Sequence, residues 1–311
     1  MIEAGFIIGL FSASIRLATP ILLAALGEIY VERSGVLNIG IEGMMLMGAL
    51  LSFLGAYISG NLWLGLLWGA GSGAVMGLIM AFLSVTLRAN QVVAGIALNI
   101  FSFGATTFIY RLLFGTQLIP PIMDKFPALN LPLLSDIPII GPILFRQIAL
   151  VYITFALVPA AWLVLFRTPL GLSIRAVGER PMAADTVGIN VYAVRYLCVI
   201  LGGIAAALGG AVLALGQMGL FVENLTAGRG FIALAIVIFS KWEPFRALGA
   251  AILFGAADAL QLRLQAMGVG VPFQLLLMLP YLLTVIVLVG VVGKAVAPAG
   301  LLIPYKKEEP R

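Results

Sequence analysis

The sequence predicts an all-α protein, a polytopic bundle of about 8–10 transmembrane helices that forms one membrane domain over residues 1–311. Hydrophobic residues make up 62% of the chain and charged residues only 10%, against roughly a quarter charged in soluble domains. The stretch from Gly43 to Leu87 carries no charge, which is long enough for two crossings. These runs are continuously apolar rather than alternating, so helices are favoured over the strands of a barrel.

Several other protein classes are excluded by composition. The chain has no His, and its single Cys198 lies in an apolar run, so we expect no metal site, cofactor or disulfide. The net charge is +5, but the basic residues separate apolar runs instead of mixing with aromatic residues, which indicates membrane orientation rather than nucleic-acid binding. The N-terminal residues 1–16 begin with an acid and lack a cleavage site, so a cleaved signal peptide is not expected.

The apolar runs between charges predict nine spans. Two are doubtful: Arg16 interrupts the first, so that 2–16 is either part of it or a separate interfacial segment, and the seventh has only eleven uncharged residues between Arg229 and Lys241. The predicted spans are 5–26, 36–58, 61–87, 91–114, 147–166, 196–216, 228–240, 245–264 and 272–292.

The distribution of Lys and Arg predicts the orientation. With nine alternating spans and a cytoplasmic C-terminal tail, twelve of the 18 basic residues fall on the cytoplasmic side, as the positive-inside rule requires. The N-terminus is then outside. The stretch 115–146, with six prolines, becomes an extracytoplasmic loop, and 167–195 becomes a cytoplasmic loop with a helical middle.

Glycines at a spacing of four residues mark the third span. Gly65, Gly69, Gly73 and Gly77 share one helix face, which allows another backbone to approach closely. The spacing favours a packing ridge inside one subunit. A dimer seam or a moving interface is the alternative.

Polar residues within the spans are the main candidates for function, because burying them in lipid is expensive. Each has a structural alternative. Asn99 could simply bond a neighbouring carbonyl. Glu42 or Asp258 either forms a salt bridge to Arg16 or Arg263, is solvated at a helix end, or lines a pathway. We expect a pathway for a neutral polar solute, lined by hydrogen-bonding groups and aromatic faces from the following residues: Asn38, Glu42, Asn99, Asp258 and Gln261, with Phe101, Phe103 and Phe231; Gln91, Glu223 and Asn224 are further polar candidates.

Two glycine-interrupted segments predict breaks in the helices. Residues 27–43 combine three acids, one Arg and four glycines before an apolar run, and residues 223–231 read ENLTAGRGF before another. Such breaks in both halves are typical of transporters with internal repeats and a central substrate site. Whether the halves are true repeats stays open, because their sequences share little.

The loop 171–195, GLSIRAVGERPMAADTVGINVYAVR, resembles the cytoplasmic coupling segment of ABC importer permeases of the nucleoside, simple-sugar and branched-chain amino-acid group. The stretches 26–49 and 228–261 are similar to signatures of the same family. The stretch 115–146 matches nothing in it. The resemblance implies that a coupling helix contacts an ATPase through these positions: Gly171, Arg175, Ala176, Gly178, Glu179, Ala183, Ala184 and Gly188.

The resemblance also implies partners: ABC ATPase subunits, a second permease subunit that is a copy or a paralogue, and an extracytoplasmic substrate-binding protein, assembled in the lipid bilayer of the cytoplasmic membrane. The chain itself has no ATP-binding motif, because its one Gly-Lys pair, Gly293-Lys294, lacks the P-loop spacing. We therefore expect a permease rather than an enzyme.

Four interpretations of the function remain at this point. The stretch 26–49 favours nucleosides, and a simple-sugar (ribose-type) permease is the alternative within the family. A proton-coupled secondary transporter would use Glu42 or Asp258 as its carboxylate. A membrane enzyme is the weakest reading, because no His set, paired carboxylates or activated nucleophile can be assembled.

Overall fold

The computed structural model describes residues 2–115, 120–130, 132, 134–135, 137–268, 272–280, 282 and 296–307. Within these residues seven helical segments are long and apolar enough to cross a membrane. They are α1 (Ile2–Arg33), α2 (Ile41–Ser59), α3 (Leu62–Ala81) with the π-helical turn η1 (Phe82–Thr86), α4 (Gln91–Phe114), α6 (Ala149–Arg167), α9 (Val191–Ala211) with η2 (Val212–Met218), and α11 (Pro244–Ala266).

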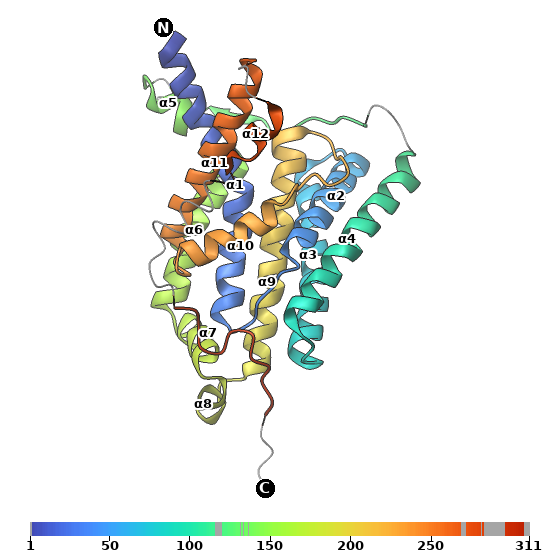
Figure 1. Ribbon diagram of the computed structural model, residues 1–311, viewed down its shortest axis with the longest axis vertical. Helices are drawn as coiled ribbons and strands as arrows, with labels where there is room; N and C mark the ends of the chain where they lie inside the picture. Colours follow the sequence, from blue (N-terminus) through green and yellow to red (C-terminus); the bar gives the residue numbers. More distant parts are fainter. Residues whose placement is uncertain are drawn as a thin grey trace.

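The shorter elements lie between these helices. Helices α7 and α8 and residues 296–307 lie at one end of the bundle, called here the α7 end, and the first turns of α1 lie at the opposite end (Figure 1). The shorter elements are β1 (Ala128–Asn130), α5 (Ile140–Leu144), β2 (Arg146–Ile148), α7 (Pro169–Glu179), α8 (Pro181–Thr186), α10 (Arg229–Phe239) and α12 (Phe273–Leu277).

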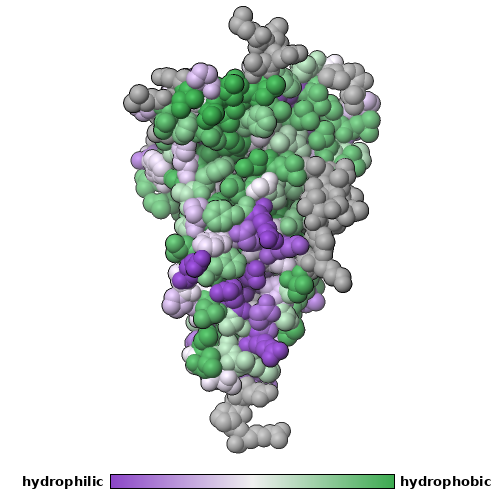
Figure 2. All heavy atoms as spheres, turned by 90° about the vertical axis from the view of Figure 1, so that its left-hand side faces the viewer, coloured by the Kyte–Doolittle hydropathy of each residue, from purple (hydrophilic) through white to green (hydrophobic). Residues whose placement is uncertain are grey.

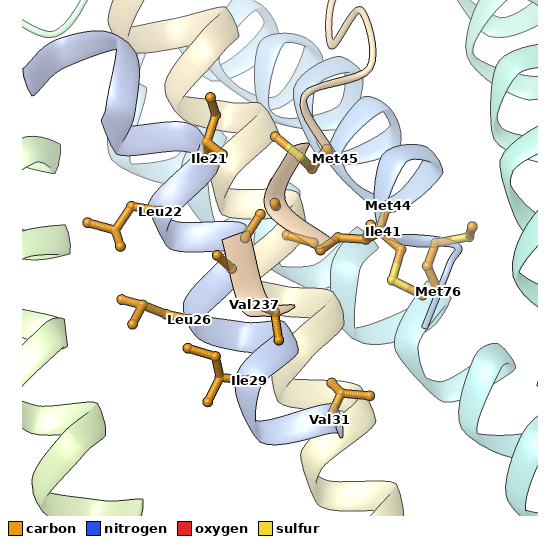
Figure 3. Close-up of a cluster of buried hydrophobic side chains, with 14 of the residues drawn as sticks. Ile21, Leu22, Leu26, Ile29, Val31, Ile41, Met44, Met45, Met76 and Val237 are labelled. Atoms are coloured by element: carbon orange, nitrogen blue, oxygen red, sulfur yellow. The ribbon is translucent and has the colours of Figure 1, made fainter. Parts of the chain in front are cut away.

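Helix α2 lies at the centre of the bundle. In the most apolar 18-residue stretch of α2, 83% is buried inside the chain, whereas the corresponding shares for α4 and α6 are 33% and 28%. Side chains from α1, α2, α3 and α10 form the surrounding core, in which Ile21, Ile41 and Met44 are fully buried (Figure 3). A residue in the first turn of α2 is therefore placed in the interior.

The glycine ridge of α3 packs inside this chain. Gly65 and Gly69 face Ser52 on α2, while Gly73 and Gly77 face the backbone of α9 at Gly203 and Ile200. Residue numbers along α9 rise as those along α3 fall, so α3 and α9 are antiparallel. The prediction of an internal packing ridge is confirmed.

The first span is one continuous helix, so the alternative of a separate segment at 2–16 is wrong. Pro20 lies inside α1 and, lacking an N–H, leaves the carbonyl of Arg16 without its helical donor. The side-chain amide of Gln217 donates to that carbonyl oxygen at 2.9 Å. A side chain of η2 thus supplies the missing hydrogen bond to the Arg16 carbonyl, and α1 continues through Arg16 and Pro20.

The predicted extracytoplasmic loop contains a small two-stranded sheet that the sequence did not predict. Strands β1 and β2 pair antiparallel, with Ala128 opposite Ile148 and Asn130 opposite Arg146. The preceding residues fold back onto η2, where the Phe126 N–H donates to the carbonyl of Leu215 at 3.0 Å. The segment therefore forms a packed cap at the opposite end.

Two of the nine predicted spans are not long helices in the described residues. Helix α10 has 11 residues and is about 16 Å long, half of a hydrocarbon core of roughly 30 Å. About half of the predicted span 272–292 lies outside the described residues, which show α12 and further helical residues at 279–280 and 282. Seven of the nine predicted spans are therefore confirmed as long apolar helices. The predicted span 228–240 is instead a helix of about half that length.

Candidate functional site

Helix α2 begins inside the bundle rather than at its α7 end. Its neighbour α4 starts at the α7 end with Gln91, and Asn99 lies eight residues further on, about 12 Å along the helix. The Asn99 side chain accepts from the Gly43 N–H at 2.7 Å and donates to the carbonyl of Ile39 at 2.9 Å. Residues 34–40, the α1–α2 connector, therefore run into the interior as non-helical chain, with a turn at each end, before α2 starts.

Helix α10 also begins in the interior, and its first turn meets the first turn of α2. The carboxylate of Glu42 accepts hydrogen bonds from Thr226 Oγ1 at 2.6 Å, Gly228 N at 2.8 Å and Gly230 N at 2.6 Å. These donors belong to the N-terminus of α10, where the helix dipole is positive. We call Asn38, Glu42, Asn99, Thr226, Gly228 and Gly230 the central junction.

The central junction has no space for larger side chains. A Cβ on Gly230 would lie 2.6 Å from Glu42 Cα, and one on Gly43 would lie 2.7 Å from Ser102 Oγ. Gly228 has φ +84°, a conformation that favours glycine. Asn38, Glu42 and Asn99 are each at most 4% exposed, so the junction is closed in this conformation.

Internal pairing was one of the alternatives for the two intramembrane acids, and in the described residues neither Arg16 nor Arg263 is the partner. Asp258 pairs with Arg229, at 3.8 Å between Oδ2 and Nη2, and not with Arg16 or Arg263. Arg263 instead donates to the carbonyl of Phe6 and lies over its ring. Arg229 is the first residue of α10, and the interior start of this helix places its charge beside Asp258. The spacing of charged residues along the sequence could not predict this pair.

The other predicted pathway residues are more dispersed. Gln261 is buried on α11, one turn from Asp258, whereas Phe231 and Phe101 are 47% and 57% exposed on the outside of the single chain. Phe103 packs against the core. The structure thus brings Asn38, Glu42 and Asn99 together, places Asp258 and Gln261 on α11, and leaves the aromatic residues apart from the central junction.

The further polar candidates have other roles. Gln91 accepts from the Leu37 N–H at 2.8 Å and so holds the connector. Glu223 forms an exposed ion pair with Arg111 at 2.7 Å. Asn224 has a positive φ of 58° in the loop before α10, where strained backbone must be held by its surroundings.

The predicted coupling segment forms the helices α7 and α8. Thr168 caps α7 by accepting from the Gly171 N–H at 3.2 Å, and Pro169 occupies its first turn. Gly171 lies against the carbonyls of α6, and Gly178 lies against the carbonyl of Arg33 at the end of α1. Each end of α7 is therefore in backbone contact with a membrane helix.

The predicted coupling residues divide into inward and outward groups. Arg175 is partly buried over the ring of Phe166, with 5.3 Å from its Cζ to the ring centroid. Gly171, Gly178 and Ala184 are buried, Ala176 is partly buried, and Glu179, Ala183 and Gly188 are exposed. Only the exposed group is available to another protein without a rearrangement.

Sequence reasoning missed several residues that build the site. The partners of Glu42 at Thr226, Gly228 and Gly230 lie 184 to 188 residues away. A Thr-x-Gly-x-Gly pattern before a short apolar run was the available signal. Glu28, which accepts from the Asn38 N–H of the connector at 3.0 Å, was also missed, as was Glu32, which accepts from Trp242 Nε1 at 2.6 Å in the turn before α11.

Curated relatives match this chain over nearly its full length. The guanosine ABC transporter permease protein NupQ of Bacillus subtilis is 42% identical, covering 95% of each chain, and the nucleoside ABC transporter permease protein NupC of Lactococcus lactis is 38% identical, covering 94% of this chain and 95% of its own. The putative glucose ABC transporter permease protein TsgC13 of Haloferax volcanii is 44% identical, covering 84% and 79%.

The same three organisms each have a second, more distant permease protein, with 25%, 28% and 27% identity to this chain. No solved structure matches the chain. Residues 10–292 match the model of the family described as branched-chain amino acid transport system / permease component. The chain therefore belongs to this family of integral membrane transport permeases.

Proposed function

We propose that this chain is a permease subunit of an ATP-driven ABC importer that moves nucleosides across the cytoplasmic membrane. The observation that carries the proposal is the similarity to guanosine and nucleoside permeases over about 95% of each chain. The central junction supports it, because two broken crossings that meet in the interior are typical of transporters. Both Glu42 oxygens are already engaged, which argues against Glu42 as the proton carrier of a secondary transporter.

The α7 end is proposed to face the cytoplasm. Arg33, Arg167, Arg180, Lys241 and Arg246 lie at helix ends or turns there, as the positive-inside rule favours. On the face shown in Figure 2, hydrophilic side chains gather in the lower half, toward the α7 end, while hydrophobic side chains cover the upper half. An ATPase would then contact α7 and α8.

The partner permease is proposed to be a paralogue rather than a copy of this chain. Three organisms each carry one permease protein at 38–44% identity and another at 25–28%. Because each of the three organisms has one permease that is more similar to this chain and one that is less similar, a heterodimer of two different permease subunits is favoured. An extracytoplasmic binding protein would deliver the substrate to the opposite end.

The proposed mechanism uses the contacts of α7. ATP-driven closure of the ATPases would push α7, and Gly178 would pass the displacement to the Arg33 carbonyl that it touches. Arg33 leads directly into the connector 34–40 and then to Glu42. Movement of the connector would separate the first turns of α2 and α10 and open the closed central junction.

Substrate choice tests the proposed activity. We expect proteoliposomes that hold this chain with its co-purifying ATPase, permease and binding protein to take up radiolabelled guanosine only when ATP is supplied. Excess unlabelled nucleoside should abolish this uptake, and excess glucose should not. The 44% identity to a putative glucose permease supports the sugar alternative, which glucose uptake without guanosine uptake would establish.

A charge on α8 tests where the ATPase docks. Val187 is 75% exposed and Ile122, at the opposite end, is 69% exposed. We expect Val187→Glu to reduce co-purification of the ATPase by about tenfold or more, because an unpaired carboxylate is disfavoured in the core of an interface. Ile122→Glu is the matched control and should leave co-purification unchanged. Equal recovery with both variants would place the docking surface elsewhere.

A further inference from the structure

The C-terminal residues 296–307 pack onto the end of α7. The Gly300 N–H donates to the carbonyl oxygen of Gly178 at 2.7 Å, and the Ala299 N–H donates to Glu179 Oε2 at 3.2 Å. Gly178 is the residue whose other side lies against the Arg33 carbonyl. The end of α7 is therefore held between α1 and the C-terminal segment.

A buried arginine of α9 joins the connector to the C-terminal segment. Arg195, at the start of α9, is 1% exposed, and it donates through Nε to the carbonyl of Ser34 at 3.2 Å and through Nη1 to the carbonyl of Ile303 at 3.1 Å. Ser34 opens the connector, and Ile303 lies in the C-terminal segment. A buried guanidinium is expensive, and here it bridges the connector and the C-terminal segment directly, beside the link that Gly178 of α7 makes between them.

The C-terminal segment is also fixed by a buried ring. Tyr305 is 4% exposed and packs with Val177 of α7, Ala184 of α8 and Val191 of α9. Its ring centroid lies 5.4 Å from that of Tyr192. Burial, followed by the hydrogen bond with Asp185, raises the pKa of Tyr305 to about 12, so the ring stays neutral at physiological pH.

We propose that residues 296–307 form a strap that makes α7 and the connector move as one body, with Arg195 as a positioning residue. This inference rests on the proposed function, because it assumes that an ATPase pushes α7. The strap follows the residues 10–292 that the family model covers. Without it, α7 would still touch Arg33 at Gly178 but would lose the hydrogen bond from Gly300 that holds its end, and displacement of α7 would reach the central junction only in part.

The strap predicts uncoupling when it is loosened. Gly300→Pro removes the N–H that bonds Gly178, and Tyr305→Ala removes the buried ring. For both variants, reconstituted with the partner subunits, we expect ATP hydrolysis within about twofold of the unmodified complex and substrate molecules moved per ATP lower by roughly tenfold, within the usual range of coupling between sites. Tyr305→Phe keeps the ring and should keep the ratio.

Leu302→Ala is a further control, because Leu302 is 45% exposed on the same segment. The amount of assembled complex, measured by size-exclusion chromatography, separates uncoupling from misfolding. An unchanged ratio of transport to ATP hydrolysis in both Gly300→Pro and Tyr305→Ala would overturn the strap. Absence of ATP-driven transport by the unmodified complex would instead overturn the proposed function and, with it, the role of the strap.

Discussion

Glu42→Gln is expected to lower the free energy of unfolding by about 3 kcal/mol and to reduce transport to background, because buried donors lose a charged acceptor. One Glu42 oxygen serves Thr226 and Gly228, and the other serves Gly230. Whichever way the Gln amide is turned, its NH₂ group faces at least one N–H or O–H donor. The variant also removes the negative charge from the positive end of α10.

The matched control for this variant is Glu223→Gln. Glu223 lies in the loop that leads to α10, but its carboxylate is exposed and pairs with the exposed Arg111, where an ion pair contributes little. We expect this variant to unfold and to transport like the unmodified chain, as measured by denaturant titration in detergent and by uptake. Equal free energies of unfolding and equal uptake for the two variants would contradict the prediction that the three hydrogen bonds of Glu42 stabilise the central junction.

The position of the junction explains what sequence can and cannot predict in this chain. Apolar runs predict α4 at 91–114 as the structure has it, because lipid requires a continuous apolar helix. The start of α2 was predicted at 36 and observed at Ile41. The difference arises because the connector satisfies its backbone with Gln91, Asn99 and Glu28, and these side chains come from other helices.

The same limit applies to the charged residues. That Glu42 and Asp258 need partners follows from the cost of a buried charge, and this was predicted. The donors that bind these two carboxylates are positioned by the loop 219–228 and the start of α10. The path of this loop into the interior follows no hydrophobic periodicity, so the sequence pattern does not predict it. The strap was not predicted for a similar reason. Its contacts with Gly178 and Arg195 are made by its backbone atoms, and backbone contacts leave no pattern of residue types in the sequence.

The glycine ridge was predictable because spacing alone places its members on one face, and it supports the second large prediction. Gly73→Ala is expected to lower the free energy of unfolding by about 2–3 kcal/mol. Its Cβ would fall onto the Gly203 carbonyl and lie 2.6 Å from the Ala207 Cβ. Neither atom can rotate away, so α3 and α9 must separate.

Gly71→Ala, two residues away on α3, should have the opposite sign. A Cβ at Gly71 meets nothing within 4 Å, so replacing a helical glycine should stabilise the chain by about 0.5–1 kcal/mol. The two variants share composition, helix and chemistry, and differ only in which face carries the methyl group. Denaturant titration of both in detergent measures the difference directly. Destabilisation of similar size in both would mean that the loss comes from a methyl group anywhere on α3 and not from the contact of Gly73 with α9.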